Sequence, residues 1–470
     1  MPLLGLLTGN ERDNLGDTPQ LPLRNLYVTG SRTEPGGVKL VGRPALKYVS
    51  ATELNANGTT GVYKQDGVLS GYRTLIFGTD VSFPSDDTTI SGNLVPSVAG
   101  NAIGAIVTNG GNVKFDDGST VRTVTTPDNF NCRKVLESEG RFVFLRRGSH
   151  RYYWTEPLAN MLDGSGDIEI DGLSYASAEY EPDELYDGLF YKGILVLFGS
   201  ETVEMHSPSG NENSPWTPIL GSAIDRGILQ TGCATLWNNS FAWIGQDYSV
   251  YRYTGSGKEK ISTPGVERLL RAAGTAANLP RLDRFNFEGR EFLRVWVDAD
   301  TPDQILDADT GEWCEWATDD AQFLGGPSLE FDDYTVFYSK TIGKQLHLSR
   351  VKSFVAGTPE STIKYLFHAG LPIDGGQVTM HNVLLRCQTD LSGDTIALRT
   401  SNDKGDSWTS QGSVTLDGPR VKVEWRSLGM FDQQGFLAEF SCTQTTPSVA
   451  PTEFAVSGAY FNEFVMGRSR

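Results

Sequence analysis

The chain has 470 residues, of which 39% are hydrophobic and 10% aromatic, a globular composition too long for one ordinary core. Its 52 Gly and 22 Pro are spread over turn-like positions, which indicates many short strands and excludes a low-complexity tract. The formal net charge of −18 argues against non-specific adhesion to nucleic acid, although it does not exclude a protein through which DNA merely passes.

The pattern of cysteines and apolar runs is typical of a protein made in the cytosol. Five cysteines lie far apart without a CxxC pair, which is typical of reduced, buried thiols. The opening MPLLGLLTGN has no basic lead and only a short apolar run, so no secretory signal is expected there. No stretch approaches the roughly 18 apolar residues of a membrane span, so none is predicted.

Residues 1–50 are predicted to form an N-terminal arm that joins the body at a few points. Leu21–Val28 and Val38–Val41 each have the composition of a strand. Prolines interrupt the remainder of the segment, because proline cannot donate a backbone hydrogen bond.

A meander of short antiparallel strands recurs over residues 51–355, and Asp187–His206 shows it most clearly. Within this stretch Ile194–Phe198 is apolar on both faces, as expected of a strand that is covered on both sides. A Lys-Gly pair precedes the run and a Gly-Ser pair follows it, and both pairs suit tight turns. After the second turn the pattern alternates between apolar and polar residues, as in a half-buried strand.

Similar units start roughly 40–50 residues apart, which is the repeat length of a propeller blade. Blades in a ring cover one another's faces, which a single four-stranded sheet cannot do alone. The sequence therefore predicts an all-β fold, with a β-propeller of six or seven blades over residues 51–355. A lectin-like sandwich is the alternative all-β solution, but it would not need so many similar units.

One helix is predicted in a connection between two blades. Thr263 suits the N-cap, Pro264 the first helical position and Gly274 the end, and Val266–Ala273 carries an apolar face. A packing role is favoured over a binding role for this helix.

Residues 356–470 are predicted to form a separate C-terminal antiparallel β domain resembling a sandwich, because alternating strands replace the meanders. Within it, Ser401–Trp408 matches the Asp-box S-x-D-x-G-x-[ST]-W. Asp-boxes recur in sialidase propellers, where they are structural turns. The single copy here lies outside the repeated region, so a turn is the favoured interpretation.

No catalytic, metal or cofactor site is predicted. Asp298–Asp303 and Asp307–Glu312 approach calcium loops, but Pro302 occupies a ligand position and neither segment has the EF-hand spacing. Asp307–Trp313 reads better as a hairpin turn whose tryptophan packs on the next blade. The histidines form no metal-binding pair, and neither a nucleophile elbow nor a phosphate-binding loop is present.

Several motifs resemble the tail hub proteins of short-tailed bacteriophages, the packaged-DNA stabilisation family, also called nozzle proteins. Tyr175–Ser207 looks like the family's Y-x-x-A-x-x-x-P-D followed by a blade ending in F-G-S-x-T-[IV]-E. Ile261–Ala272 is similar to its inter-blade helix, and Ser401–Trp408 with Trp425–Gly429 looks like its C-terminal domain. Met430–Asp432 departs from the family, whose members often carry basic residues there.

The resemblance implies a non-enzymatic virion protein, made in the host cytoplasm, that forms a homo-hexameric ring in the tail below the portal and adaptor proteins. Such a hub retains packaged DNA, forms the channel for its ejection and holds other tail proteins such as a fibre, spike or needle. Double-stranded DNA would pass through the channel without sequence-specific binding. The candidate interface residues are Val266, Arg268, Leu269, Trp425 and Arg426.

Two other functions are compatible with a propeller. A glycan-binding or glycan-cleaving propeller, such as a sialidase or a tail depolymerase, would carry several Asp-boxes, an arginine cluster and a carboxylate pair. Of these features, only the Asp-box is found in this sequence, as a single copy. A cytosolic propeller that serves as a scaffold for protein partners is the second alternative.

Overall fold

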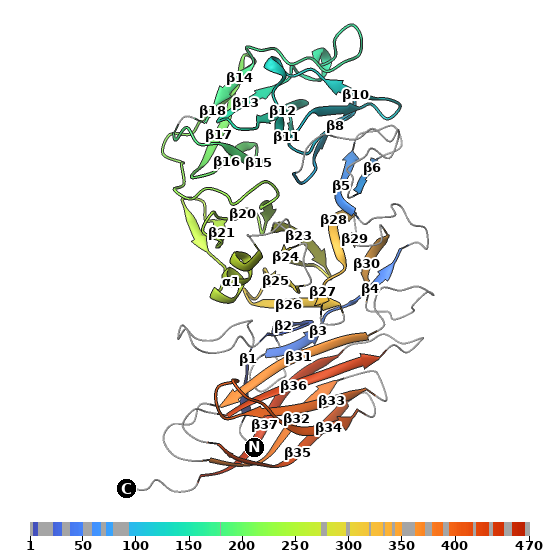
Figure 1. Cartoon of the computed structure of the whole chain (residues 1–470), viewed down its shortest axis with the longest axis vertical. Coiled ribbons are helices and arrows are strands. Elements are labelled where there is room, and N and C mark those ends of the chain that lie inside the picture. The colour runs from blue at the N-terminus through green and yellow to red at the C-terminus, as the bar shows by residue number, and fades with distance from the viewer. Residues whose placement is uncertain are drawn as a thin grey trace.

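The computed structural model is built almost wholly of β-strands (Figure 1). Over its described residues it has one α-helix, α1 (Pro264–Ala273), and two short 3-10 helices, η1 (Pro127–Asn129) and η2 (Leu158–Asn160). The helix lies where the sequence predicts it, although Gly274, its predicted end, lies outside the described residues. The described residues are 3–7, 22–30, 38–49, 59–66, 72–78, 94–178, 180–273, 280–297, 301–318, 321–331, 334–340, 344–349, 362–371, 378–388, 394–416, 420–431, 436–445 and 454–465.

The first part of a β-propeller consists of three antiparallel four-stranded blades, each a meander whose first strand lies beside the first strand of the next blade (Figure 1). Blade 1 is β7–β10 (Ser97–Gly100, Ala105–Thr108, Val113–Asp116, Val121–Val124), blade 2 is β11–β14 (Cys132–Ser138, Arg141–Arg146, Arg151–Trp154, Tyr175–Ser177), and blade 3 is β15–β18 (Leu185–Tyr191, Ile194–Gly199, Val203–Asn211, Ser214–Pro218).

Three further blades and a two-stranded sheet complete the propeller. Blade 4 is β19–β22 (Ala234–Trp237, Ser240–Ile244, Val250–Tyr253, Lys258–Lys260), blade 5 is β23–β27 (Arg281–Phe287, Arg290–Trp296, Asp303–Asp307, Trp313–Thr318, Ala321–Gln322), and blade 6 is β28–β30 (Gly325–Phe331, Tyr334–Ser339, Gln345–Ser349) with β4 (Ala45–Tyr48). The seventh sheet, β5 (Thr59–Asp66) and β6 (Tyr72–Gly78), lies between blade 6 and blade 1 and closes the ring. The predicted propeller of six or seven blades is therefore confirmed.

Strand β16 shows why the blades need one another. Leu195 and Leu197 pack in one core with residues of blade 2, whereas Val196 and Phe198 pack in another core with residues of blade 4. All four side chains are fully buried. The run is apolar on both faces because a neighbouring blade covers each face, and the turn before it uses Gly193 at a φ of 80°.

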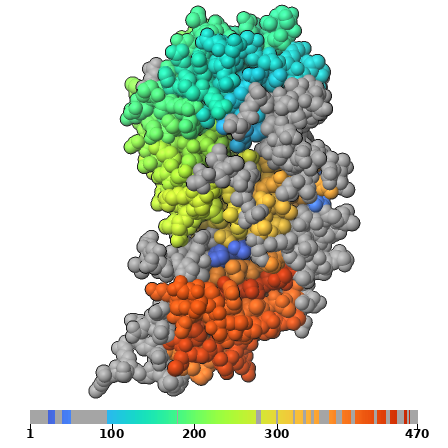
Figure 2. Space-filling model, viewed as in Figure 1, coloured from blue at the N-terminus to red at the C-terminus, as the bar shows by residue number. Residues whose placement is uncertain are grey.

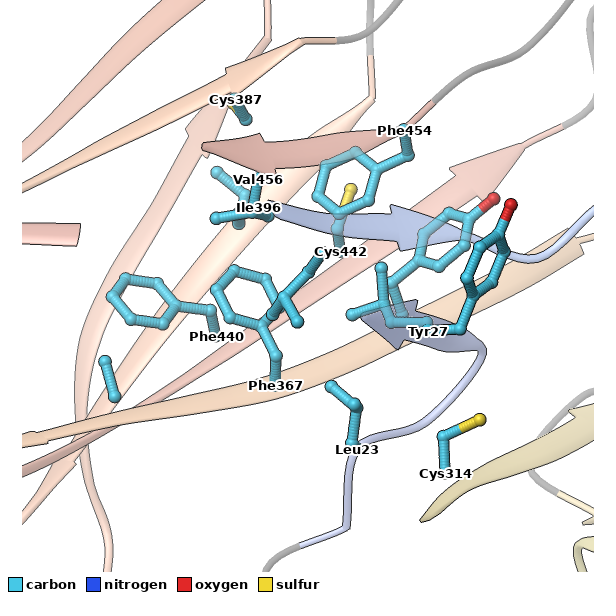
Figure 3. Packing of buried hydrophobic residues seen from close by; sticks show 14 of the residues in the cluster. Leu23, Tyr27, Cys314, Phe367, Cys387, Ile396, Phe440, Cys442, Phe454 and Val456 are labelled. Carbon is cyan, nitrogen blue, oxygen red and sulfur yellow. The ribbon is translucent and has the colours of Figure 1, made fainter. Parts of the chain in front are cut away.

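The C-terminal domain is a two-layered sandwich, as predicted. One layer runs β35–β32–β37–β3–β2 (Arg420–Phe431, Val378–Gln388, Ala455–Val465, Val38–Gly42, Leu26–Gly30), and the other runs β1–β31–β36–β33–β34 (Leu3–Leu7, Thr362–Leu371, Phe436–Thr445, Thr395–Ser401, Thr409–Thr415). Strand β1 pairs with β31 over one half and with β37 over the other, and so connects the two layers. Aromatic and aliphatic side chains from both layers meet between them (Figure 3).

The strands of the first 50 residues are divided between the two parts of the molecule. Strands β1, β2 and β3 belong to the sandwich, whereas β4 is the last strand of blade 6 and pairs with β30. The predicted strands in Leu21–Val28 and Val38–Val41 correspond to β2 and β3. The boundaries of the predicted arm (1–50), propeller (51–355) and C-terminal domain (356–470) lie outside the described residues and stay predictions.

Residues Leu23–Asn25 form a short bridge between the propeller and the sandwich. On one side, the Asn25 N–H donates to the Glu315 carbonyl of β26 at 2.7 Å, and the Glu315 N–H donates to the Leu23 carbonyl at 2.8 Å. On the other side, Arg24 and Leu366 of β31 exchange backbone hydrogen bonds of 2.8 and 3.1 Å. The sheet of blade 5 therefore continues through this bridge into the sandwich.

A buried arginine seals the same junction. Arg43 is 1% exposed, its Nε donates to Asn25 Oδ1 at 2.7 Å, and its guanidinium donates to the carbonyls of Pro44 and Ala317 at 2.9 and 2.7 Å. Asn25 has a φ of 57°, a conformation that asparagine tolerates, and its Nδ2 donates to the Lys364 carbonyl at 2.8 Å. Buried polar networks of this kind fix one arrangement of the segments they connect.

One apolar core crosses the junction. Leu23 and Tyr27 pack together with Cys314 of blade 5 and with Phe367 of the sandwich, as Figure 3 shows. The Tyr27 ring meets Phe292 of β24 edge to face at 5.8 Å. The two parts, which are stacked end to end in Figure 2, therefore share both a hydrogen-bonded sheet and a core.

Val196→Asp is expected to prevent normal folding of the propeller. It would place a carboxylate without a partner in a fully buried strand, which lowers the free energy of unfolding by at least several kcal/mol. Soluble expression and circular dichroism check this result. Thr217→Asp on the exposed side of β18 is the control within the same blade, and a soluble Val196→Asp protein with a native spectrum would contradict the role of β16.

Arg43→Ala is expected to lower the melting temperature and to uncouple the sandwich from the propeller. The substitution leaves buried acceptors on Asn25, Pro44 and Ala317, which costs about 3 kcal/mol or more. Differential scanning calorimetry should show one transition in the wild type and a lower or split transition in the variant. Arg426→Ala, which removes an exposed ion pair, is the control, and equal melting of Arg43→Ala and wild type would refute the role of the junction.

Candidate functional site

Helix α1 packs one face on the core between blades 3, 4 and 5. Val266 and Leu270 are fully buried there, whereas Leu269 is half-buried and Arg268 is exposed. The helix starts where the sequence predicts, with the Thr263 carbonyl accepting the Glu267 N–H at 3.0 Å.

A buried carboxylate ties α1 to blade 4. Glu267 accepts a hydrogen bond from Ser262 Oγ at 3.0 Å and pairs with Lys260 at 2.9 Å and with Arg271 at 3.3 Å. Burial opposes ionisation of Glu267, but Lys260 and Ser262 outweigh it and lower its pKa. The helix is therefore fixed to blade 4 by charge as well as by its apolar face.

Trp425 and Arg426 lie on β35 of the sandwich. Trp425 is 4% exposed, packs against Phe440 and donates from Nε1 to the Gly412 carbonyl at 3.3 Å. Arg426 points outward and pairs with Glu424 at 3.0 Å. This tryptophan connects the edge strands of the two layers, which is a structural role.

The structure does not bring the two sets of predicted interface residues together. Helix α1 lies in the propeller and β35 at the opposite end of the sandwich (Figure 1). Val266 and Trp425 have buried side chains that pack within the chain, and their interface role stays a prediction. For Arg268, Leu269 and Arg426 the interface role stays a prediction.

The Asp-box of the sandwich is a self-contained turn. Asp403 accepts hydrogen bonds from Ser401 Oγ at 2.6 Å and from the Ser407 N–H at 2.9 Å, and these bonds lower its pKa to about 2. Gly405 has a φ of 98°, which explains the glycine of the motif. The carboxylate is occupied by its own loop, in agreement with the predicted structural role.

Asp183, which follows Pro182 in the family-like motif, closes the turn between β16 and β17. Its Oδ2 accepts the N–H groups of Glu201 at 2.6 Å and Thr202 at 3.0 Å. Burial raises the pKa of Asp183, and the two backbone hydrogen bonds oppose the rise. The Pro-Asp pair in the sequence was the available signal for this residue, although its partners are visible only in the structure.

Acidic residues of β15 and of the segment before it hold blade 3 to its neighbours. Glu184 pairs with Arg133 of blade 2, and Asp187 pairs with Lys134 of the same blade at 2.9 Å. Asp187 also accepts the Gly232 N–H from the segment that leads into blade 4, at 2.7 Å. The Asp187 side chain, which is 1% exposed, therefore joins blades 2, 3 and 4.

A charged cluster seals the seam between blades 5 and 6. Asp303 of β25 pairs with Lys340, which follows β29, at 2.8 Å, and it lies 3.6 Å from Arg294. Arg294 also pairs with Asp283 and donates to the Gly325 carbonyl of blade 6 at 2.7 Å. Burial raises the pKa of Asp303 to about 6, although Lys340 and Arg294 act in the opposite direction.

The described residues hold no group of three or more histidine, cysteine, aspartate or glutamate side chains that could bind a metal ion. Asp307–Trp313 is a hairpin turn, since Asp307 accepts the Asp309 N–H at 2.9 Å and Gly311 has a φ of 72°. Trp313 donates to the Ile261 carbonyl at 2.8 Å, so it contacts the preceding blade and the predicted contact with the next blade is wrong. Asp298–Asp300 lies outside the described residues.

No helix in the described parts of the chain combines the length and the apolar character needed to cross a membrane.

Sequence comparison agrees with the architecture. A family model described as "Bacteriophage P22 Gp10, beta-propeller" matches residues 89–301, which contain blades 1 to 4 and the first two strands of blade 5. This segment is therefore similar to the phage tail hub family. Over 235 residues the chain is 24% identical to the "Tail hub protein gp10" of Salmonella phage P22, a match that covers 45% of this chain and 47% of that protein. The match thus spans about half the length of the tail hub relative.

Global similarity to solved structures is low. YCF48 from Cyanidioschyzon merolae is 14% identical with a TM-score of 0.33, over 60% of this chain and 95% of that one. A glycoside hydrolase family 43 arabinoxylan arabinofuranohydrolase from Bacillus subtilis is 12% identical with a TM-score of 0.26, over 94% of this chain and 96% of that one. Scores in this range support no inference about function.

The seam between blades 5 and 6 predicts a pH dependence of stability. The pKa of Asp303 is about 6 in the fold against an ordinary 3.8, so the folded state binds the proton more tightly than the unfolded state. The resulting stabilisation is present below pH 4 and is lost as the pH rises through 6, a change on the order of 3 kcal/mol. Urea unfolding between pH 4 and 8 measures it.

Asp303→Asn should remove this part of the pH dependence, whatever its effect on stability at one pH. Asp128→Asn is the control, because the Asp128 side chain is 79% exposed. A wild-type pH profile in Asp303→Asn would show that the seam does not titrate as described.

Proposed function

We propose that the chain is a structural component of a phage tail, a hub that forms a homo-hexameric ring below the portal and adaptor proteins. The match of residues 89–301 to the P22 Gp10 propeller family is the observation that carries this proposal. The hub retains the packaged DNA after filling and provides the channel for its ejection. It also holds other tail proteins, such as a fibre, spike or needle, and it reaches the virion after synthesis in the host cytoplasm.

The closed ring and its junction with the sandwich support a role as a wall element. The ring is closed by β4 and by the seventh sheet, and the Leu23–Asn25 bridge joins it to the sandwich. The hydrogen-bonded bridge and the shared core of the described residues oppose relative motion of the two parts, as a wall element requires. A symmetric ring then needs only one self-complementary interface, repeated around the axis.

A non-enzymatic role is consistent with the chemistry of the described residues. The Asp-box carboxylate is bound by its own turn, and the inter-blade carboxylates of Glu184, Asp187 and Asp303 are paired with arginine or lysine. Each of these acids therefore has a structural partner in place of a substrate.

The net charge supports a channel that lets DNA slide. A channel that grips DNA needs lysine and arginine facing the phosphates, with an affinity that falls steeply as salt rises. A chain with a net charge of −18 presents on average the opposite field, which repels the duplex toward the axis.

The assembly itself is tested by electron microscopy of the purified protein, alone and with a portal–adaptor complex. Hexameric rings that cap the complex are the expected result. Monomers under both conditions would contradict the hub proposal.

Assembled rings are expected to bind duplex DNA negligibly at about 50 mM and about 200 mM salt, because an acidic or neutral lumen releases no counterions on contact. Fluorescence anisotropy with a labelled duplex measures this, with intact rings verified on the grid. Tight binding at the lower salt that disappears at the higher would mean a basic lumen and would refute the sliding channel.

A further inference from the structure

A cavity of about 240 Å³ lies beside β18 at the outer edge of blade 3. Its walls are mostly apolar and include Met205, Ile219 and Leu220, and Tyr180 lies at its side. Glu204 contributes the one carboxylate among the lining residues. The cavity is therefore an apolar slot with a single carboxyl side chain.

The carboxylate of this slot is held in place by its own fold. Glu204 is 5% exposed, its Oε1 accepts the Tyr180 N–H at 2.9 Å, and its Oε2 lies 3.5 Å from His206 Nε2. His206 is in turn 3.1 Å from the Tyr152 hydroxyl of blade 2. A buried acid with a fixed orientation is a prepared partner for a cation that enters the slot.

Large apolar side chains stand in solvent around the slot. Leu220 is 96% exposed and Tyr180 is 66% exposed, and both residues line the slot. A leucine gains from burial only when a second surface covers it, and clustered exposed apolar residues mark contact surfaces.

The segment that leads to the slot is strongly acidic. Residues 155–184 contain no lysine, arginine or histidine, and their net charge of −9 is half of the −18 of the chain. Arginines from blades 1 and 2 pair with three of the acids, at Glu156, Asp167 and Glu184. The acids are Glu156, Asp163, Asp167, Glu169, Asp171, Glu179, Glu181, Asp183 and Glu184.

We infer that this slot with the segment 155–184 is a docking surface for a basic segment of a partner protein that carries apolar residues between its cations. A lysine or arginine stem lies along Ile219 and Met205 with its charge at Glu204, and a neighbouring apolar side chain covers Leu220 and Tyr180. Long cationic side chains bind in this way because their stems are apolar. Charge complementarity selects this occupant, since the same field repels nucleic acid. The inference does not depend on the hub proposal.

Two fluorescein-labelled peptides of equal length and charge test the inference, one with arginines separated by leucine and one with arginines separated by glycine. The wild type is expected to bind the leucine peptide at least about tenfold more tightly, because burying leucine against Leu220 and Tyr180 adds to the electrostatic attraction. Fluorescence anisotropy at low and high salt measures both affinities. Equal affinity for the two peptides would overturn the inference, because acidity alone would then explain binding.

Variants locate the site. Leu220→Ser and Tyr180→Ser change exposed side chains, so the fold should be retained, and each should remove most of the preference for leucine. Glu204→Gln should weaken both peptides and reduce the salt dependence. Met430→Ser, 52% exposed on the sandwich, is the matched control and should change nothing. A leucine preference that persists in both Leu220→Ser and Tyr180→Ser would place binding elsewhere and refute the proposal.

Discussion

The backbone bridge at Leu23–Asn25 is the contact on which the rest of the architecture depends. It hydrogen-bonds to blade 5 on one edge and to the sandwich on the other. These three residues therefore join a sheet of the propeller to a sheet of the sandwich. Side chains add to the bridge, because Arg24 pairs with Glu315 at 3.1 Å and Arg290 donates to the Val28 carbonyl at 3.1 Å. Interfaces between domains in one chain usually permit relative motion. Here the hydrogen-bonded backbone and the shared core oppose it.

Much of the fold follows from local sequence, whereas the bridge does not. The meander of Asp187–His206 was predictable because a strand that is apolar on both faces needs cover on both sides, and β16 indeed packs between blades 2 and 4. The contacts of Arg24 with Glu315 join residues 291 positions apart, and no periodicity encodes such a pairing. The same holds for β4, whose four residues give no sign that blade 6 is its partner. Sequence thus predicts the blades but not the segments that close and join them.

The candidate interface shows the corresponding limit for side chains. Val266 and Trp425 belong to motifs that resemble a family, but apolar residues in such motifs can be there for packing, and both are buried. The structural roles of Asp183 and Asp187 were not predicted. From sequence alone, a carboxylate in or beside a strand is expected to face solvent, because its partners are not known. The acid-rich stretch 155–184 was visible as composition, whereas its position beside an apolar slot required the structure.

The place of β4 in blade 6 has a consequence for biosynthesis. The three other strands of that blade come from residues 325–349, so residues 45–48 must wait until about 300 further residues have been made before they find their partner. Contacts that bridge such long loops form late and slowly, because the entropy of closing the loop is lost before the pairing compensates for it. A chain that ends in blade 5 would lack β28–β30 and leave strand edges unpaired, and unpaired edges favour aggregation. Closure of blade 6 by an early strand therefore requires that the chain has been made through β30.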